Sequence, residues 1–210
     1  MIKFKNSEIT PESIYKKRRS FIKSIGLGAS TLAMSTIPFV NKSLASERDK
    51  LTSYKDITTY NNYYEFGTSK SDPYRNSQIF KTTPWDITIE GEVEKPIKLS
   101  MEEISEMFIS EERIYRLRCV EGWSMVIPWM GFSLSKLLSK VNPTNKAKFV
   151  EFESVYDPAQ MKGQRYPVLN WPYNEGLRID EAMHPLTTVV TGLYGKKLPN
   201  QNGAPLRIFI

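Results

Sequence analysis

Cys119 is the residue with the clearest chemical potential, because it is the only cysteine among the 210 residues. Isoleucine, leucine and arginine residues between Arg113 and Arg118 predict a short β-strand before it, and Gly122 predicts a turn after it. Such a strand presents a sulfur at the end of a sheet, where proteins commonly hold ligands. Arg116 and Arg118 lie close by in sequence and would favour the thiolate, the form that binds metals and attacks electrophiles.

A lone cysteine is also commonly a small buried hydrophobic residue, and residue type alone leaves both interpretations open. His184, the only histidine, has no sequence pattern that pairs it with Cys119. A zinc site needs three or four ligands, which one cysteine and one histidine do not supply. The sequence has no dinucleotide-binding, P-loop or GxSxG motif. This profile suits a protein that supplies one thiolate to a metal while a large cofactor performs the chemistry.

Residues 1–45 have the layout of an export signal and are predicted to lie outside the fold. A basic block contains the pair Arg18-Arg19 followed by Phe21, then comes a weakly apolar stretch, and Ser43-Leu44-Ala45 offers small residues before a cleavage point. This pattern predicts export to the periplasm by the twin-arginine route. The alternative is a membrane anchor, but the apolar stretch is short and contains Pro38, whereas a spanning helix needs ~20 apolar residues.

The charge of the remaining chain excludes one class of partner. The whole sequence has 29 Lys and Arg against 23 Asp and Glu, and residues 1–45 contain eight of the basic residues and two of the acidic ones. Residues 46–210 therefore have 21 of each and are formally neutral. Nucleic-acid binding, which depends on a basic surface, loses its main support. A single cysteine also rules out an internal disulfide, so residues 46–210 must fold as one domain around a hydrophobic core.

The periodicity along residues 46–210 predicts a mixture of short strands and short helices. Ser46 to Tyr60 is predicted to be a loosely held lead-in, and Ser100 with Glu103 forms the sequence pattern of a helix capping box. Without a regular alternation of strand and helix, the order favours an α+β fold. Strands are expected at 85–93, 113–119, 149–155, 187–191 and 206–210, and helices at 100–108, 134–141 and 180–183.

The last residues, Leu206 to Ile210, have the pattern of a strand. Natural termini are usually polar and loosely ordered. We therefore expect that the sequence is truncated at its C-terminal end.

Four blocks of sequence resemble a known family. They cover residues 60–67 (YNNYYEFG), 112–132 (ERIYRLRCVEGWSMVIPWMGF), 180–187 (DEAMHPLT) and 201–207 (QNGAPLR). They are similar to the catalytic subunits of periplasmic protein-methionine-sulfoxide reductases, which are molybdenum enzymes of the sulfite-oxidase fold. The resemblance implies a sulfite-oxidase-like molybdopterin-binding domain over residues 46–210, without the C-terminal part of the family fold.

The resemblance also implies one mononuclear molybdenum on one molybdopterin, with Cys119 as the catalytic residue and the metal ligand. Other positions match those that hold the pterin and its phosphate, and Ser154 stands where the family has a threonine. Arg207 matches a position that holds the phosphate, and arginine pairs with phosphate in a bidentate way. The implied cofactor-binding residues are Asn61, Tyr64, Glu65, Ser154, Asn202 and Arg207.

The implied activity is the reduction of methionine sulfoxide residues in oxidised periplasmic proteins, with oxygen-atom transfer to reduced molybdenum. The implied partner is a membrane haem subunit that supplies the electrons. Two alternatives remain: the chain is a reductase of other S- or N-oxides or a sulfite oxidase within the same fold, or it is an inactive fragment that only binds.

Overall fold

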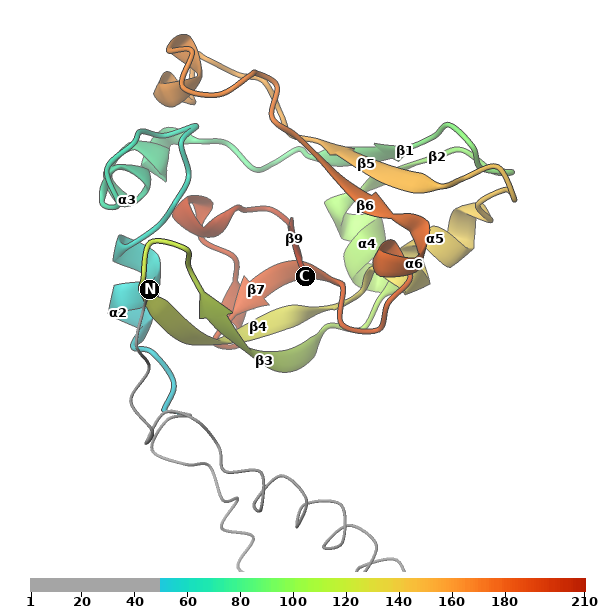
Figure 1. Cartoon of the computed structure of the whole chain (residues 1–210), viewed down its shortest axis with the longest axis horizontal. Coiled ribbons are helices and arrows are strands. Elements are labelled where there is room, and N and C mark those ends of the chain that lie inside the picture. The colour runs from blue at the N-terminus through green and yellow to red at the C-terminus, as the bar shows by residue number, and fades with distance from the viewer. Residues whose placement is uncertain (1–49) are drawn as a thin grey trace, which may run out of the picture. The chain divides into compact units, whose positions relative to one another are not determined.

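The computed structural model describes residues 50–210, and Figure 1 shows how their helices and strands are arranged. The predicted export signal at 1–45 lies outside these described residues. Within them, no helix combines the length and the apolar character that crossing a membrane requires.

A five-stranded antiparallel sheet is the largest element and contains the strand before Cys119. Its strands are β3 (Glu111–Arg118), β4 (Ser124–Ser133), β7 (Thr188–Leu193), β8 (Lys196–Lys197) and β9 (Arg207–Phe209). Strand β3 lies at one edge and pairs with β4, β4 pairs with β7, and β8 and β9 pair with different parts of β7. The sheet therefore brings Arg207 at the start of β9 beside Val190 of β7.

Sequence reasoning missed strand β4, because proline usually interrupts a central strand. Pro128 nevertheless lies within it, opposite Ile114 of β3. Its carbonyl still accepts a bond of 3.0 Å from the backbone N–H of Tyr194. A bulge follows at Met130 and Gly131, where the register with β7 shifts.

Two antiparallel hairpins lie across a layer of helices from this sheet (Figure 1). They are formed by β1 (Asp86–Ile89) with β2 (Ile97–Ser100) and by β5 (Phe149–Glu153) with β6 (Asn174–Arg178). The helices between are α4 (Met101–Met107), α5 (Leu134–Val141) and α6 (Ile179–Ala182). The main core joins all three layers, with Leu99, Ile104, Phe132, Leu138, Leu177 and Val189 among its buried members.

Further short helices complete the described part of the chain. These are α2 (Tyr54–Thr59), α3 (Asp72–Asn76), η3 (Ser77–Ile79), η4 (Lys162–Arg165) and η5 (Asn200–Asn202). The prediction of a loosely held lead-in up to Tyr60 is wrong for α2. Ile57 of this helix is 1% exposed and packs with Trp129 and Leu193 in a second core.

The predicted α+β class is confirmed, and several local predictions match closely. Helix α5 has the predicted bounds, and the capping box before α4 is complete, since Ser100 accepts from the Glu103 N–H at 3.2 Å and Glu103 accepts from the Ser100 N–H at 2.8 Å. Strands β2 and β6 were not predicted. Both are short, at four and five residues, so their local pattern is weak.

Candidate functional site

Cys119 lies in a tight turn between β3 and β4, which we call the cysteine turn (Cys119–Trp123). Its backbone N–H donates to the Trp123 carbonyl at 2.9 Å, and its carbonyl accepts from the Gly122 N–H at 3.0 Å. Gly122 has a φ of +89°, a conformation that side chains disfavour, so glycine suits the turn. The structure therefore confirms a half-buried sulfur at the end of a strand.

Two polar side chains approach the sulfur. Asn62 Nδ2 lies 3.7 Å from Cys119 Sγ, and Glu121 Oε2 lies 3.9 Å from it. Glu121 is held in place, because it pairs with Lys70 Nζ at 2.8 Å and accepts from Trp123 Nε1 at 3.0 Å. The hydrogen bond from Lys70, followed by that from Trp123, lowers the pKa of Glu121 below its usual value. An ionised carboxylate and an amide thus flank the sulfur.

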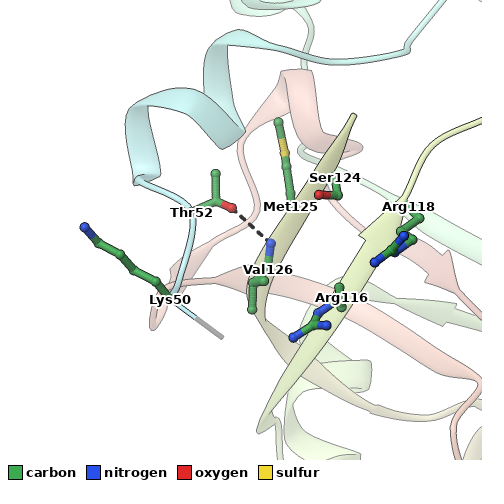
Figure 2. A pocket seen from close by; sticks show the side chains of 7 residues that line it. All are labelled: Lys50, Thr52, Arg116, Arg118, Ser124, Met125 and Val126. Atoms are coloured by element: carbon green, nitrogen blue, oxygen red, sulfur yellow. Dashed lines mark hydrogen bonds between the residues drawn. The ribbon is translucent and has the colours of Figure 1, made fainter. Parts of the chain in front are cut away.

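Arg116 and Arg118 do not make these contacts. They line a hollow on the outer side of the hairpin, together with Lys50, which Figure 2 shows. The sulfur's hydrogen-bond partners come instead from the loop after α2 and from the cysteine turn itself. The idea that the arginines favour the thiolate therefore stays a prediction.

Asn61, Asn202 and Arg207 meet in the interior, although as many as 146 positions separate them (207 − 61). Asn202 Nδ2 donates to Asn61 Oδ1 and to the Ile57 carbonyl, both at 3.0 Å, and Arg207 Nη1 donates to the Asn202 carbonyl at 3.1 Å. The Arg207 guanidinium lies 5.4 Å from the ring centroids of both Tyr63 and Trp129. We call Asn61, Tyr63, Asn202 and Arg207 the buried polar cluster.

The buried polar cluster has hydrogen-bonding groups left over. Among the described residues, four buried side-chain atoms have no hydrogen-bond partner, and three belong to this cluster or touch it: Asn202 Oδ1, Arg207 Nε and Trp129 Nε1. Buried polar groups in proteins are almost always paired, so unpaired ones need an explanation. A polar ligand beside the cluster would supply an acceptor for the two N–H groups and a donor for the amide oxygen. The predicted cofactor residues therefore fit a pterin with its phosphate.

Glu65 and Tyr64 lie on the same loop, two to four residues beyond Asn61 and Asn62. Burial raises the pKa of Glu65 above its usual 4.5, and Arg207 partly opposes the shift. Burial likewise raises the pKa of the Tyr63 hydroxyl. The carbonyl of Glu65 accepts from the Gly163 N–H at 2.7 Å, and a Cβ at Gly163 would lie 1.8 Å from the Tyr64 carbonyl, so only glycine permits this close approach.

Ser154 is the predicted residue that the structure connects least to the others. It follows β5, its side chain is exposed, and its backbone N–H donates to the Tyr173 carbonyl at 2.9 Å. No described hydrogen bond joins its hydroxyl to the other predicted residues. Its role as a pterin ligand stays a prediction.

The loop from Tyr60 to Glu65 joins the two parts of the site. Tyr60 packs edge-on against Trp123 at 5.2 Å, Asn62 approaches Cys119, and the neighbouring Asn61 bonds to Asn202. Sequence reasoning missed four residues of the site: Asn62, Tyr63, Lys70 and Glu121. Asn62 and Tyr63 stood between predicted residues, and Glu121 lies two positions after the cysteine, so adjacency was an available signal. Nothing local marked Lys70.

Comparisons with known proteins show which family the chain resembles. The family model described as "Oxidoreductase molybdopterin binding domain" matches residues 74–210. One solved structure, the sulfane dehydrogenase SoxCD from Paracoccus pantotrophus, superposes with a TM-score of 0.51 over 68% of this chain and 36% of that one. At 16% identity this likeness shows the fold alone. The fold and the matched domain define a molybdopterin-binding oxidoreductase.

Curated relatives narrow the family further. The chain is 50% identical over 98% of its length to the protein-methionine-sulfoxide reductase catalytic subunit MsrP of Xanthomonas axonopodis pv. citri, of which it covers 68%. It is 48% identical over its whole length to the protein of the same name from Xanthomonas campestris pv. campestris, of which it covers 69%. The chain belongs to the family of protein-methionine-sulfoxide reductase catalytic subunits, within the molybdopterin-binding oxidoreductases.

Proposed function

We propose that this chain binds a mononuclear molybdenum on one molybdopterin and reduces methionine sulfoxide residues in oxidised proteins. The observation that carries the proposal is the identity of about half the residues, over nearly the whole chain, with subunits named for this reaction. The single cysteine at the end of a sheet, joined by one loop to a buried polar cluster, supports it from the structure.

The reaction converts a sulfoxide, two protons and two electrons into a thioether and water, which restores an apolar methionine side chain. Molybdenum on molybdopterin, when bound, supplies the two-electron oxygen-transfer chemistry. Cys119 provides the thiolate ligand, since soft sulfur donors suit such a metal. Asn62 donates towards that sulfur and would orient the thiolate, whereas the contact with Glu121 is one in which the protonated thiol donates. Lys70 and Trp123 hold Glu121 in place.

The organic part of the cofactor is assigned to the buried polar cluster. The Arg207 guanidinium pairs with the phosphate, because its planar fork of donors matches phosphate oxygens. Asn202 presents an unpaired amide oxygen, and Asn61 fixes its orientation. Tyr64, Glu65 and Ser154 complete the proposed set on the loops around it.

The setting of the reaction is part of the same proposal. The arginine pair Arg18-Arg19 supports export to the periplasm by the twin-arginine route, after the cofactor has been inserted. A membrane subunit that contains haem is the proposed electron donor, as the family resemblance implies. Oxidised exported proteins are the proposed substrates.

The first test is molybdenum and pterin per chain, measured on protein exported through its own signal, with Cys119→Ala as the control. We expect near-stoichiometric cofactor in the wild-type protein. Turnover is then compared on an oxidised protein, a small sulfoxide, a small N-oxide and sulfite. Faster reduction of the oxidised protein supports the proposal, whereas turnover of sulfite or of the N-oxide alone contradicts it. A folded, exported chain without molybdenum or pterin would instead support the binding-only interpretation.

A further inference from the structure

The outer side of the β3–β4 hairpin carries a hollow of about 320 Å³ that the proposed reaction does not use. We call it the basic hollow, and Figure 2 shows the seven side chains that line it. Its residues are Lys50, Thr52, Arg116, Arg118, Ser124, Met125 and Val126. Three of the seven are cationic and none is acidic, in a chain whose residues 46–210 are formally neutral.

Three segments of backbone build this hollow. Arg116 and Arg118 alternate along β3, so both project from the same face of the hairpin, opposite Val126 and Ser124 of β4. Thr52 ties the segment before α2 to that strand, because its hydroxyl accepts from the Val126 N–H at 3.0 Å and its own N–H donates to the Val126 carbonyl at 3.0 Å. This anchoring places Lys50 at the rim of the hollow (Figure 2).

Arg118 and Lys50 are the charges of the hollow that are available to a partner. Arg118 is exposed, Lys50 is exposed, and neither forms a salt bridge with any other residue in the described range 50–210. Other charges on the hairpin already have partners, since Arg113 pairs with Glu111 and Glu121 pairs with Lys70. Clustered like charges repel each other, so an anion that binds among them relieves an electrostatic cost.

The position of the hollow ties it to Cys119. Arg118 immediately precedes the cysteine, so the two side chains project from opposite faces of the hairpin, and an extended polypeptide beside β3 alternates its own side chains in the same way. Strand β3 is at the edge of its sheet among the described strands, so an extended polypeptide has room to lie alongside. Val120, in the cysteine turn at the tip of the hairpin, is fully exposed and offers an apolar contact.

We propose that the basic hollow binds an acidic side chain of the polypeptide substrate, close in sequence to the methionine sulfoxide. The inference rests on the proposed function and narrows its substrate class to sulfoxides flanked by Asp or Glu. An extended chain advances about 3.3–3.6 Å per residue, so the acidic residue lies within about three positions of the sulfoxide. The bound carboxylate pairs with Arg118 and Lys50, and the reaction itself is unchanged.

The test uses the cofactor-loaded protein and unstructured seven-residue peptides with a central methionine sulfoxide. Glutamate or glutamine is placed at each flanking position in turn, and the ratio of the two KM values is measured. We expect KM for the glutamate peptide to be roughly threefold to tenfold lower at one or two positions, the range that a few exposed charge pairs give. High salt should remove the preference, because it screens exposed charges.

Variants then locate the effect. Lys50→Gln and Arg118→Gln should each bring the KM ratio towards one, and Arg118→Glu should reverse it in favour of lysine peptides. Lys140→Gln removes an exposed charge at the end of α5 and should leave the ratio unchanged. Because Arg118 adjoins Cys119, the molybdenum and pterin content of its variants is measured as well. If the Arg118 variants lose cofactor, the KM ratio of Lys50→Gln alone tests the inference. Since each readout is a ratio on one protein, changes in basal turnover cancel.

A binding measurement separates this inference from the proposed function. Peptides with methionine sulfone in the centre do not react, and their Kd is measured by fluorescence anisotropy with and without glutamate. Tighter binding of the glutamate peptide, lost in Lys50→Gln, supports the hollow as a polypeptide site even if no sulfoxide is reduced. Equal KM values at every position, with normal sulfoxide reduction, would overturn the inference and leave the function standing. Inorganic sulfate binding as tightly as the peptides would also overturn it.

Discussion

The cysteine turn and the buried polar cluster are joined by one loop, but they hold their side chains in different ways. In the cysteine turn, backbone bonds of 2.9 and 3.0 Å fix the chain, while the side-chain contacts to the sulfur are long, at 3.7 and 3.9 Å. In the buried polar cluster, side-chain bonds of 3.0 Å join residues from distant segments. A metal ligand next to substrate has to stay accessible, whereas the organic part of a cofactor needs a fixed anchor.

The carboxyl groups of the two regions also have pKa values that are shifted in opposite directions. At the cysteine turn, the exposed Glu121 has a lowered pKa because Lys70 and Trp123 donate to it. Beside the buried polar cluster, Glu65 has a raised pKa because burial disfavours its charge. Pairing with Lys70 and Trp123 favours the charged form of Glu121, whereas burial disfavours the charged form of Glu65.

The largest expected effect is at the cysteine turn. Cys119→Ser should lower sulfoxide turnover by at least ~10³-fold, since the metal loses its protein sulfur ligand. The thermal midpoint of the cofactor-free protein should hardly change, because the side chain is half-buried and its contacts are long. Turnover and midpoint are measured on the same preparation. A variant that keeps full turnover would remove the cysteine turn from the site.

The next effect tests the anchor. Arg207→Lys should weaken cofactor retention at least about tenfold, because lysine lacks the planar fork that pairs with phosphate and stacks between two rings. Molybdenum and pterin per chain are measured after dilution and gel filtration. Arg75→Lys, at the exposed end of α3, is the matched control and should retain cofactor like the wild type. Equal loss in both variants would argue against a specific anchor.

The third effect is on stability and distinguishes buried from exposed amides. Asn202→Ala should lower the free energy of unfolding of the cofactor-free protein by about 2–3 kcal/mol, because it removes two buried bonds and leaves Asn61 Oδ1 without its donor. Asn145→Ala changes an exposed residue and should shift stability by less than about 0.5 kcal/mol. Urea titration measures both. Similar values for the two variants would mean that the cluster does not stabilise the fold.

The smallest effect concerns pH. Because the folded protein holds the Glu65 proton more tightly than the unfolded chain, this group's contribution to stability is complete below pH 4.5 and declines as the pH rises through its higher folded pKa. Glu65→Gln removes that decline. Its thermal midpoint should match the wild type near pH 4 and exceed it by about 2–4 °C at pH 8 in cofactor-free protein.

Glu90→Gln serves as the control for this measurement, since Glu90 is exposed. Its midpoint should follow the wild type at each pH. A constant offset between Glu65→Gln and the wild type, independent of pH, would show that the Glu65 carboxyl does not titrate differently in the folded protein. Only the lowered pKa of Glu121 would then distinguish the two regions.

Much of the fold followed from local patterns. Helix α5 and the capping box at Ser100 are encoded by neighbouring residues, and they formed as predicted. Helix α2 was missed because Ile57 is held by Trp129 and Leu193, which are far away in sequence. Strand β4 was missed because Pro128 argues against a central strand, and only its neighbours on both sides make the strand possible.

The sequence by itself determined the single sulfur, the strand and glycine turn around it, the absence of ordinary acid–base motifs and the family resemblance. These depend on residue identity and on near neighbours. Only the tertiary structure decided that Asn62 and Glu121 approach the sulfur, whereas Arg116 and Arg118 line a separate hollow with Lys50. It also joined Asn61 to Asn202 and placed the Arg207 guanidinium close to the rings of Tyr63 and Trp129. Such contacts depend on the packing of distant segments, which no local pattern of residues specifies.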